Sequence, residues 1–339
     1  MLKNQTVKIT MVAALLVAVA LVVPHTSSFL ILLATRILAF SILVMSLDIL
    51  LGYTGLPSLG HAAYLGVGAY ATAILASKFQ FGLGYDFWLV VLIGIGTAAA
   101  LAAVFGLLAI RATGVYFLMI TLALGQCVWG LAYRWNSLTN GDNGINLTGR
   151  PEFGGLDLSN EVTFFYVVFG FFAVSLLVMY ILVRSPFGRS LAGIRERELR
   201  MQILGYNTWL HKYIAFIIAG AFGGLSGVLW AHTAGIVSPE NVIITTSVDA
   251  ILMAVLGGAG TLVGGLIGTA IVIALREYLS TLVPWWQYVL GAVYVLTILY
   301  LPSGLMGIPE RIRQGRTGGR KKKQPGKQQD SKKLASVTT

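Results

Sequence analysis

The chain has 339 residues, of which 56% are hydrophobic and 11% are charged. A soluble globular chain averages about 25% charged residues, so this composition excludes water as the solvent for most of the chain. The net charge of +11 does not indicate a nucleic-acid-binding protein, because residues 310–333 carry +8 of it in one segment after the last apolar run. A basic segment beside a final membrane span is typical of a cytoplasmic flank. We therefore predict an all-α polytopic membrane protein.

Ten apolar segments are long enough to cross or enter a bilayer, where a span needs about 20 mostly apolar residues. The first follows Lys3 and Lys8 and resembles a signal peptide, but it lacks a small-residue cleavage site, so we interpret it as a retained span. The short glycine-bounded segments can also be interpreted as half-helices or re-entrant segments. The ten segments are residues 9–23, 29–51, 58–77, 87–110, 113–133, 162–183, 212–234, 243–258, 261–276 and 285–302.

Charge in the connecting loops predicts the orientation of these spans. Residues 184–212 hold six basic side chains against two acids, whereas residues 134–161 hold two basic side chains against four acids. A ten-span count that starts inside makes the first loop cytoplasmic and the second an outer loop, as the positive-inside rule requires. The resulting domains are a cytoplasmic N-terminus (1–8), a transmembrane domain (9–308) and a basic cytoplasmic tail (309–339).

A glycine pattern, Gly-x-x-Gly-x4-Gly, occurs twice along the chain with an offset of 205 residues. Each copy follows a leucine and precedes a span rich in small residues, which predicts an internal repeat, although chance similarity is the alternative. Broken helices in corresponding positions mark the substrate pathway in other transporters. The candidate pathway residues at these two breaks are Gly52, Gly55, Gly60, His61, Tyr64, Gly257, Gly258 and Gly260.

Catalytic and metal-binding patterns are absent from the sequence. It contains no Gly-x4-Gly-Lys-Ser/Thr phosphate loop and no His-Glu-x-x-His or Gly-x-Ser-x-Gly motif. The single cysteine, Cys127, excludes a disulfide framework or a thiolate cluster. We predict no catalytic residue, no metal ligand and no cofactor bound by this chain. Ionisable residues near the span ends, where charge is expensive and suggests function, are Arg36, Asp48, Asp249, Arg276 and Glu277.

The loop of residues 184–212 contains a second predicted element. Residues 190–204 are expected to form one short amphipathic helix that ends at Gly205, a favourable C-terminal cap. Its apolar positions form an approximate stripe, and its charged residues lie elsewhere. Such a helix can lie on the membrane surface or dock into a groove of another protein, and composition favours neither. The stripe consists of Leu191, Ile194, Leu199, Ile203 and Leu204.

Five segments together make the chain similar to a known family over about residues 30–308. The most distinctive is Ser185-Pro-Phe-Gly-Arg-Ser-Leu-Ala-Gly-Ile-Arg-Glu-Arg-Glu198, followed by Leu204-Gly205. The others are residues 51–70, 114–123, 138–145 and 253–262. On these segments the chain resembles the LivM-type membrane permease subunits of ABC importers for branched-chain amino acids.

This resemblance implies partners that composition does not show. They are a second, LivH-like permease subunit, two ATP-binding subunits that hold ATP and Mg, an extracytoplasmic substrate-binding protein and membrane lipid, with no nucleic acid. The loop of residues 184–212 then resembles the helix that couples the permease to its ATPase. The implied location is the cytoplasmic (inner) membrane of a bacterium or archaeon, with both termini cytoplasmic. The implied coupling residues are Ser190, Arg195, Glu196, Glu198 and Gly205.

One departure from the family lies in the coupling segment. Family members usually place small residues after its acid, whereas Leu199, Arg200 and Met201 follow Glu198 here. This departure leaves the role intact and puts in question which partner surface the segment fits. The alternative functions are an importer permease for urea, short amides or another small polar solute, and an ion-coupled secondary transporter.

Overall fold

The computed structural model describes residues 18–78, 87–147, 149–150, 152–153, 156–300 and 304–307. Met1–Met306 forms one structural unit, and Gly307–Thr339 forms a second. The cytoplasmic N-terminus, most of the first predicted span and the basic tail lie outside the described residues.

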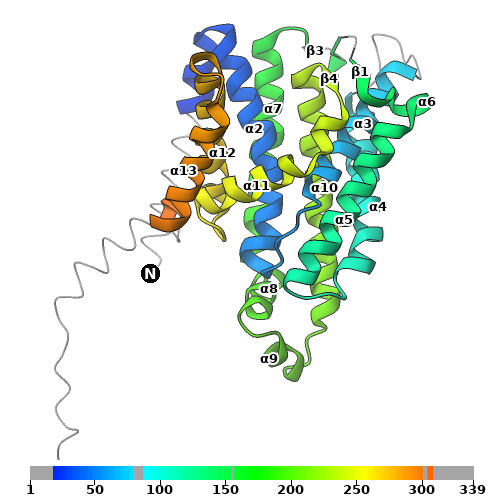
Figure 1. Cartoon of the computed structure of the whole chain (residues 1–339), viewed down its shortest axis with the longest axis vertical. Coiled ribbons are helices and arrows are strands. Elements are labelled where there is room, and N and C mark those ends of the chain that lie inside the picture. Colours follow the sequence, from blue (N-terminus) through cyan, green and yellow to red (C-terminus); the bar gives the residue numbers. More distant parts are fainter. Residues whose placement is uncertain are drawn as a thin grey trace, which may run out of the picture. The chain divides into compact units, whose positions relative to one another are not determined.

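Helices make up almost all of the described chain (Figure 1). The long helices are α2 (Ser28–Asp48), α3 (His61–Lys78), α4 (Phe87–Ala109), α5 (Val115–Arg134), α7 (Glu161–Arg184), α10 (Thr208–Ala234), α11 (Ile244–Gly257), α12 (Leu262–Leu282) and α13 (Trp286–Tyr300). The short helices are η1 (Val23–His25), the π-helix η2 (Ile49–Thr54), α6 (Asn136–Thr139), η3 (Gly141–Asn143), α8 (Pro186–Glu196), α9 (Glu198–Ile203), η4 (Pro239–Val242) and η5 (Leu305–Gly307). The strands are β1 (Ile145–Asn146), β2 (Glu152–Phe153), β3 (Leu156–Asp157) and β4 (Ile236–Val237).

Nine of the ten predicted spans fall on described residues, and each of them contains a helix. Six helices of the described chain, α2 with η2, α4, α5, α7, α10 and α12, are long and apolar enough to cross a membrane. The 14-residue α11 is apolar but shorter. The prediction of an all-α polytopic protein is therefore confirmed, and the count of ten spans stays a prediction because the first lies largely outside the described part.

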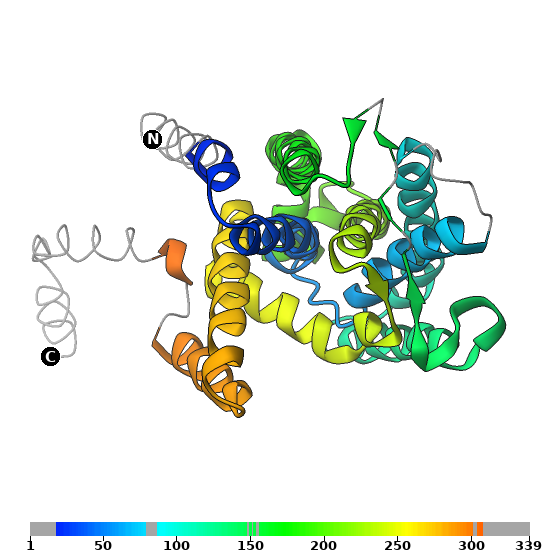
Figure 2. The same ribbon diagram turned by 90° about the horizontal axis from the view of Figure 1, so that it is seen from above.

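Helix α10 lies at the centre of the bundle and packs against α2, α3 and α4 (Figure 2). The contacts depend on small residues: a Cβ at Gly68 would collide with the backbone of Gly224, and a Cβ at Gly220 would collide with the side chain of Ala102. Small residues let helices approach closely in lipid, where the hydrophobic effect does not drive them together. Many glycines of the described helices therefore serve this close packing.

The two predicted loops lie at opposite ends of α7 (Figure 1). At one end β1 pairs antiparallel with β4, with Ile145 opposite Val237. Arg150 closes this end by donating to the carbonyl oxygens of His232 (3.2 Å) and Leu158 (3.3 Å). Partial burial lowers the pKa of the Arg150 guanidinium. At the other end α8 and α9 project from the bundle.

Replacing Gly227 of α10 by alanine should destabilise the bundle, because the added Cβ would collide with the Leu65 carbonyl of α3 and lie 2.9 Å from the Ala69 nitrogen. Overpacking of this kind costs about 1–3 kcal/mol. Thermal unfolding of the detergent-purified protein measures the effect. The matched control is Gly170→Ala on α7, where nothing lies within 4 Å of the new Cβ. Equal melting temperatures of the two variants would contradict this packing.

Candidate functional site

The two predicted glycine breaks meet inside the bundle. At the first, α2 continues into the π-helix η2, which ends at Gly55 with a left-handed backbone (φ 75°). At the second, α11 ends at Gly257, and positive φ angles at Gly258 (117°) and Gly260 (85°) turn the chain into α12. Glycine adopts such angles without a Cβ penalty. Both copies of the glycine pattern are therefore real helix interruptions, whereas their origin in a duplication stays a prediction.

Direct bonds hold the two breaks together. The Gly260 amide donates to Asp48 Oδ1 at 2.7 Å, across 212 residues of sequence. A Cβ on Gly52 would collide with both the Gly260 backbone and the Asp48 carboxylate. Asp48 is 1% exposed, so its carboxylate replaces water for a backbone amide that the break leaves without a helical partner. We call these four residues, Asp48, Gly52, Gly55 and Gly260, the junction.

Arg195 of α8 reaches the junction from outside. Its Nη1 donates to the Gly52 carbonyl oxygen, and its guanidinium attracts the Asp48 carboxylate. Its side-chain stem covers Gly55, where a Cβ would lie 3.0 Å from Arg195 Cγ. The same Nη1 lies 3.5 Å from where a Cβ of Gly260 would stand. One arginine therefore bonds to the first helix break and lies close to the second.

The segment that carries Arg195 differs from its prediction. One helix over residues 190–204 was expected, but the structure has two, α8 and α9, separated by Arg197 in an extended conformation (φ −156°, ψ 98°). We call α8 and α9 the arm. The single-helix prediction is wrong because the two halves have different partners, so one straight apolar stripe cannot serve both. Helix α8 is anchored at its start by Ser185, whose hydroxyl accepts from the Gly188 amide at 3.3 Å.

The expected apolar stripe is divided in the same way. Leu191 and Ile194 of α8 are 1% and 3% exposed and belong to the bundle. In contrast, Leu199, Ile203 and Leu204 at α9 are 75%, 87% and 65% exposed. We call these last three side chains the arm face. Three exposed leucine and isoleucine side chains on one short helix indicate a surface that another molecule covers.

An ion pair and a C-terminal cap fix helix α9, which carries this face. Lys212 of α10 is almost buried and pairs with Glu198 at 2.6 Å. After α9 the Gly205 amide donates to the Gln202 carbonyl and the Tyr206 amide donates to the Met201 carbonyl. With Gly205 at φ 87°, these two bonds form a Schellman cap. The predicted cap at Gly205 is confirmed.

The remaining predicted residues of the arm and the pathway have different surroundings. Ser190 is 5% exposed and its hydroxyl donates to the Phe187 carbonyl, whereas Glu196 is exposed at the end of α8. His61 and Tyr64 are fully buried: His61 Nε2 lies 2.9 Å from Ser46 Oγ, and Tyr64 packs edge-on to His61.

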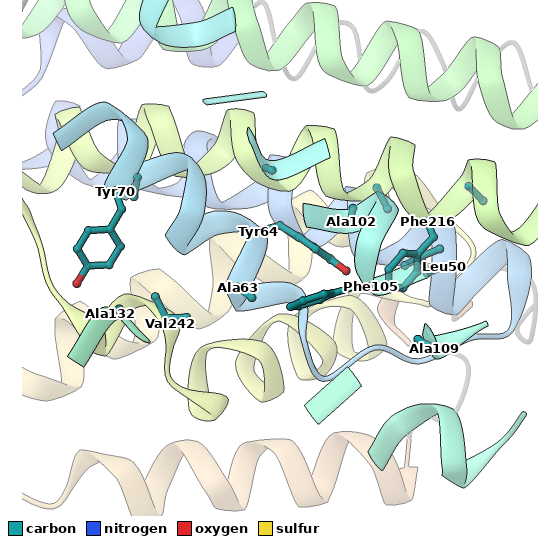
Figure 3. Packing of buried hydrophobic residues seen from close by; sticks show 14 of the residues in the cluster. Leu50, Ala63, Tyr64, Tyr70, Ala102, Phe105, Ala109, Ala132, Phe216 and Val242 are labelled. Atoms are coloured by element: carbon teal, nitrogen blue, oxygen red, sulfur yellow. The ribbon is translucent and has the colours of Figure 1, made fainter. Parts of the chain in front are cut away.

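Tyr64 sits in an apolar cluster with Phe105 and Phe216 (Figure 3). Gly60 lies against the backbone of Thr121, and Gly257 against that of Gly264. In this structure these pathway candidates are packing positions at the breaks. Their role in a pathway stays a prediction.

A hollow of about 720 Å³ opens at the end of the bundle opposite the arm. Asn140 begins its turn in a left-handed conformation (φ 61°), and the Asn140 side-chain amide donates to the Gly144 carbonyl at 2.9 Å. The sequence indicated only a polar turn here. The lining residues are Tyr133, Arg134, Asn136, Asn140, Asp142 and Asn143.

Comparison with known proteins identifies the architecture. A family model described as the permease component of branched-chain amino acid transport systems matches residues 29–299. The chain belongs to this family. It is 31% identical to the high-affinity branched-chain amino acid permease LivM of Escherichia coli, over 80% of this chain and 69% of LivM. No solved structure matches.

Two further relatives are less similar in sequence. The chain is 25% identical to LivH of Escherichia coli, over 80% of this chain and 92% of LivH. It is 24% identical to the guanosine ABC transporter permease NupQ of Bacillus subtilis, over 75% of this chain and 84% of NupQ. The chain is thus a multi-pass ABC transporter permease subunit, a transport component. The resemblance found from the sequence is confirmed.

Replacing Asp48 by leucine should destabilise the junction, because the buried Gly260 amide would lose its acceptor. An unsatisfied buried donor costs about 1–3 kcal/mol. Asp48→Asn is the matched control, since its carbonyl oxygen can still accept that bond. Thermal unfolding in detergent should give a lower melting temperature for the leucine variant than for the asparagine variant. Identical values would show that the Asp48–Gly260 bond contributes nothing.

Proposed function

We propose that this chain is a transmembrane permease subunit of an ATP-driven importer that translocates branched-chain or related hydrophobic amino acids. The observation that carries the proposal is the arm. Its arm face is apolar and exposed, and its Arg195 donates a hydrogen bond to the junction of the two broken helices. Family membership and the similarity to LivM and LivH support the substrate class.

The arm end of the bundle is the cytoplasmic end in this proposal. The loop that carries the arm is rich in basic residues, and the loop at the opposite end is acidic, in line with the positive-inside rule. Both termini would then be cytoplasmic, in the inner membrane of a bacterium or archaeon. The hollow beside Asn140 would face the extracytoplasmic substrate-binding protein.

Two ATP-binding subunits would carry ATP and Mg, because this chain has no phosphate-binding loop. One of them would bind the arm face. A second, LivH-like permease would complete the pathway. Nucleotide energy can move the bundle only if the ATPases bind the arm differently in two states. Arg195 would transmit that movement, since a shift of α8 pulls on the Gly52 carbonyl and changes the contact with Gly260.

Two sets of contacts make the arm suitable for transmitting force. Leu191 and Ile194 anchor α8 in the bundle, so the arm cannot move without displacing its neighbours. The Lys212–Glu198 pair ties α9 to α10, the helix at the centre of the bundle. A push on the arm face would therefore reach both α10 and the junction.

A different small polar solute is the second candidate substrate. The similarity to the guanosine permease NupQ shows that the family fold serves more than amino acids. Uptake by the complete importer in proteoliposomes, with labelled leucine, urea and guanosine compared side by side, tests the substrate class. Transport on an ion gradient without ATPase subunits would instead support a secondary transporter.

The double substitution Leu199→Asp and Ile203→Asp should remove the ATPase subunits from the purified complex. Both side chains are exposed, so the fold should survive, while two carboxylates would be placed in an apolar contact. A loss of at least about 1.4 kcal/mol, or tenfold in affinity, is expected. Ile236→Asp, also exposed but at the opposite end, is the control. Co-purification at wild-type levels by the double variant would refute docking at the arm face.

Replacing Arg195 by alanine should uncouple transport from ATP hydrolysis while the ATPase subunits stay bound. Loss of a hydrogen bond made by a charged group costs about 1.5–3 kcal/mol, so uptake per ATP should fall at least tenfold. Arg189→Ala, an exposed site on the same helix, should keep normal coupling. An Arg195→Ala importer with an unchanged ratio of uptake to hydrolysis would exclude transmission through Arg195.

A further inference from the structure

Four ionisable side chains form two ion pairs within the membrane-embedded helices, away from the junction. Arg36 of α2 donates to Glu277 of α12 at 2.7 Å. Arg276, the residue before Glu277 in α12, donates to Asp249 of α11. We call these four residues the charged quartet. It has no net charge, and its two ion pairs connect α12 to α2 and to α11.

The quartet lies on the surface of the bundle. Its side chains are 32% (Arg36), 29% (Glu277), 36% (Arg276) and 21% (Asp249) exposed. Arg276 also lies over the Trp286 ring of α13 at 5.6 Å. Near it, Tyr294 Oη and Arg276 Nε are buried without a hydrogen-bond partner among the described residues.

Between the helix ends, the exposed faces of α4 and α7 carry no such ion pairs. Their exposed large side chains are uniformly hydrophobic, and between their ends both helices lack Asp, Glu, Lys and Arg. Such surfaces suit hydrocarbon, whereas ionisable side chains within membrane spans are costly and almost always face protein or a water-filled cavity. In Figure 2, α12 and α13 lie on the other side of α2 from α4. The exposed side chains are Trp88, Leu89, Leu92, Val104, Leu107 and Leu108 on α4 and Tyr166, Val174, Leu177, Val178 and Ile181 on α7.

We infer that the face around the charged quartet is the surface on which the second permease subunit packs. This inference rests on the proposed function, which requires a second permease, and adds the place where it binds. LivM and LivH both match this chain over 80% of its length, so a permease partner of either kind has a related fold.

Related folds pair most simply about a two-fold axis, with the same patch on each partner. Such an interface must be complementary to itself. A quartet with two positive and two negative side chains suits such an interface, because a partner with a similar set of charges would place a carboxylate near each arginine. A patch of one sign would repel its counterpart.

Site-specific photo-crosslinking in the assembled importer tests this assignment. A benzophenone amino acid replaces Val248 (37% exposed) beside Asp249, or Tyr278 (66% exposed) beside Glu277. The control positions are Leu177 (58%) and Val174 (60%) on α7. All four positions are exposed, so the fold should tolerate the change, and uptake by each complex reports its integrity. Crosslinked products are identified by mass spectrometry.

We expect the two quartet positions to crosslink a second permease at least tenfold more efficiently than the two α7 positions, which should crosslink phospholipid. Crosslinks from the quartet positions to phospholipid alone, or stronger permease crosslinks from α7, would overturn the inference and leave the proposed function standing if uptake persists. A transporting complex that contains no second permease would overturn both.

Discussion

The bond between the Gly260 amide and the Asp48 carboxylate is the interaction on which the rest of the structure depends. A helix broken inside a bilayer exposes backbone groups that lipid cannot satisfy. Here two helices are broken at the same place, and the first supplies the acceptor that the second lacks. The second break offers a free amide, and the end of α2 offers a buried acceptor. Both breaks can therefore exist away from water only because they touch.

Close contact at the junction determines what surrounds it. Glycine is required at Gly52 because a Cβ would separate the two breaks. A guanidinium reaches the Gly52 carbonyl because an arm from outside the bundle lies directly beside it. A site of this kind can change packing without exposing new backbone to lipid. In the proposed function it is also the point at which a movement outside the bundle would alter the helices within it.

Much of the fold could be predicted from the sequence. Runs of apolar residues about 20 long predicted nine helices close to their observed positions, because hydrocarbon thickness and backbone hydrogen bonding allow few other structures. The glycine pattern predicted both breaks, and Gly205 predicted the end of α9. The arm was predicted less well. Periodicity joined Leu191 to Leu204 in one stripe, but the bundle buries the first half and leaves the second exposed, a difference that no local pattern contains.

The sequence by itself determined that this is a helical membrane protein, where its chain breaks and which loop is basic, since these follow from local composition. Only the tertiary structure decided which remote residues meet. Asp48 was recognised simply as an acid at a span end, and Arg195 as one of the implied coupling residues, with no sign that it contacts Gly52. Likewise, Arg36 and Glu277 pair across 241 residues. Such pairs form only where two helices cross at the right positions. Those positions depend on small-residue packing throughout the bundle, and the sequence around each paired residue does not contain them.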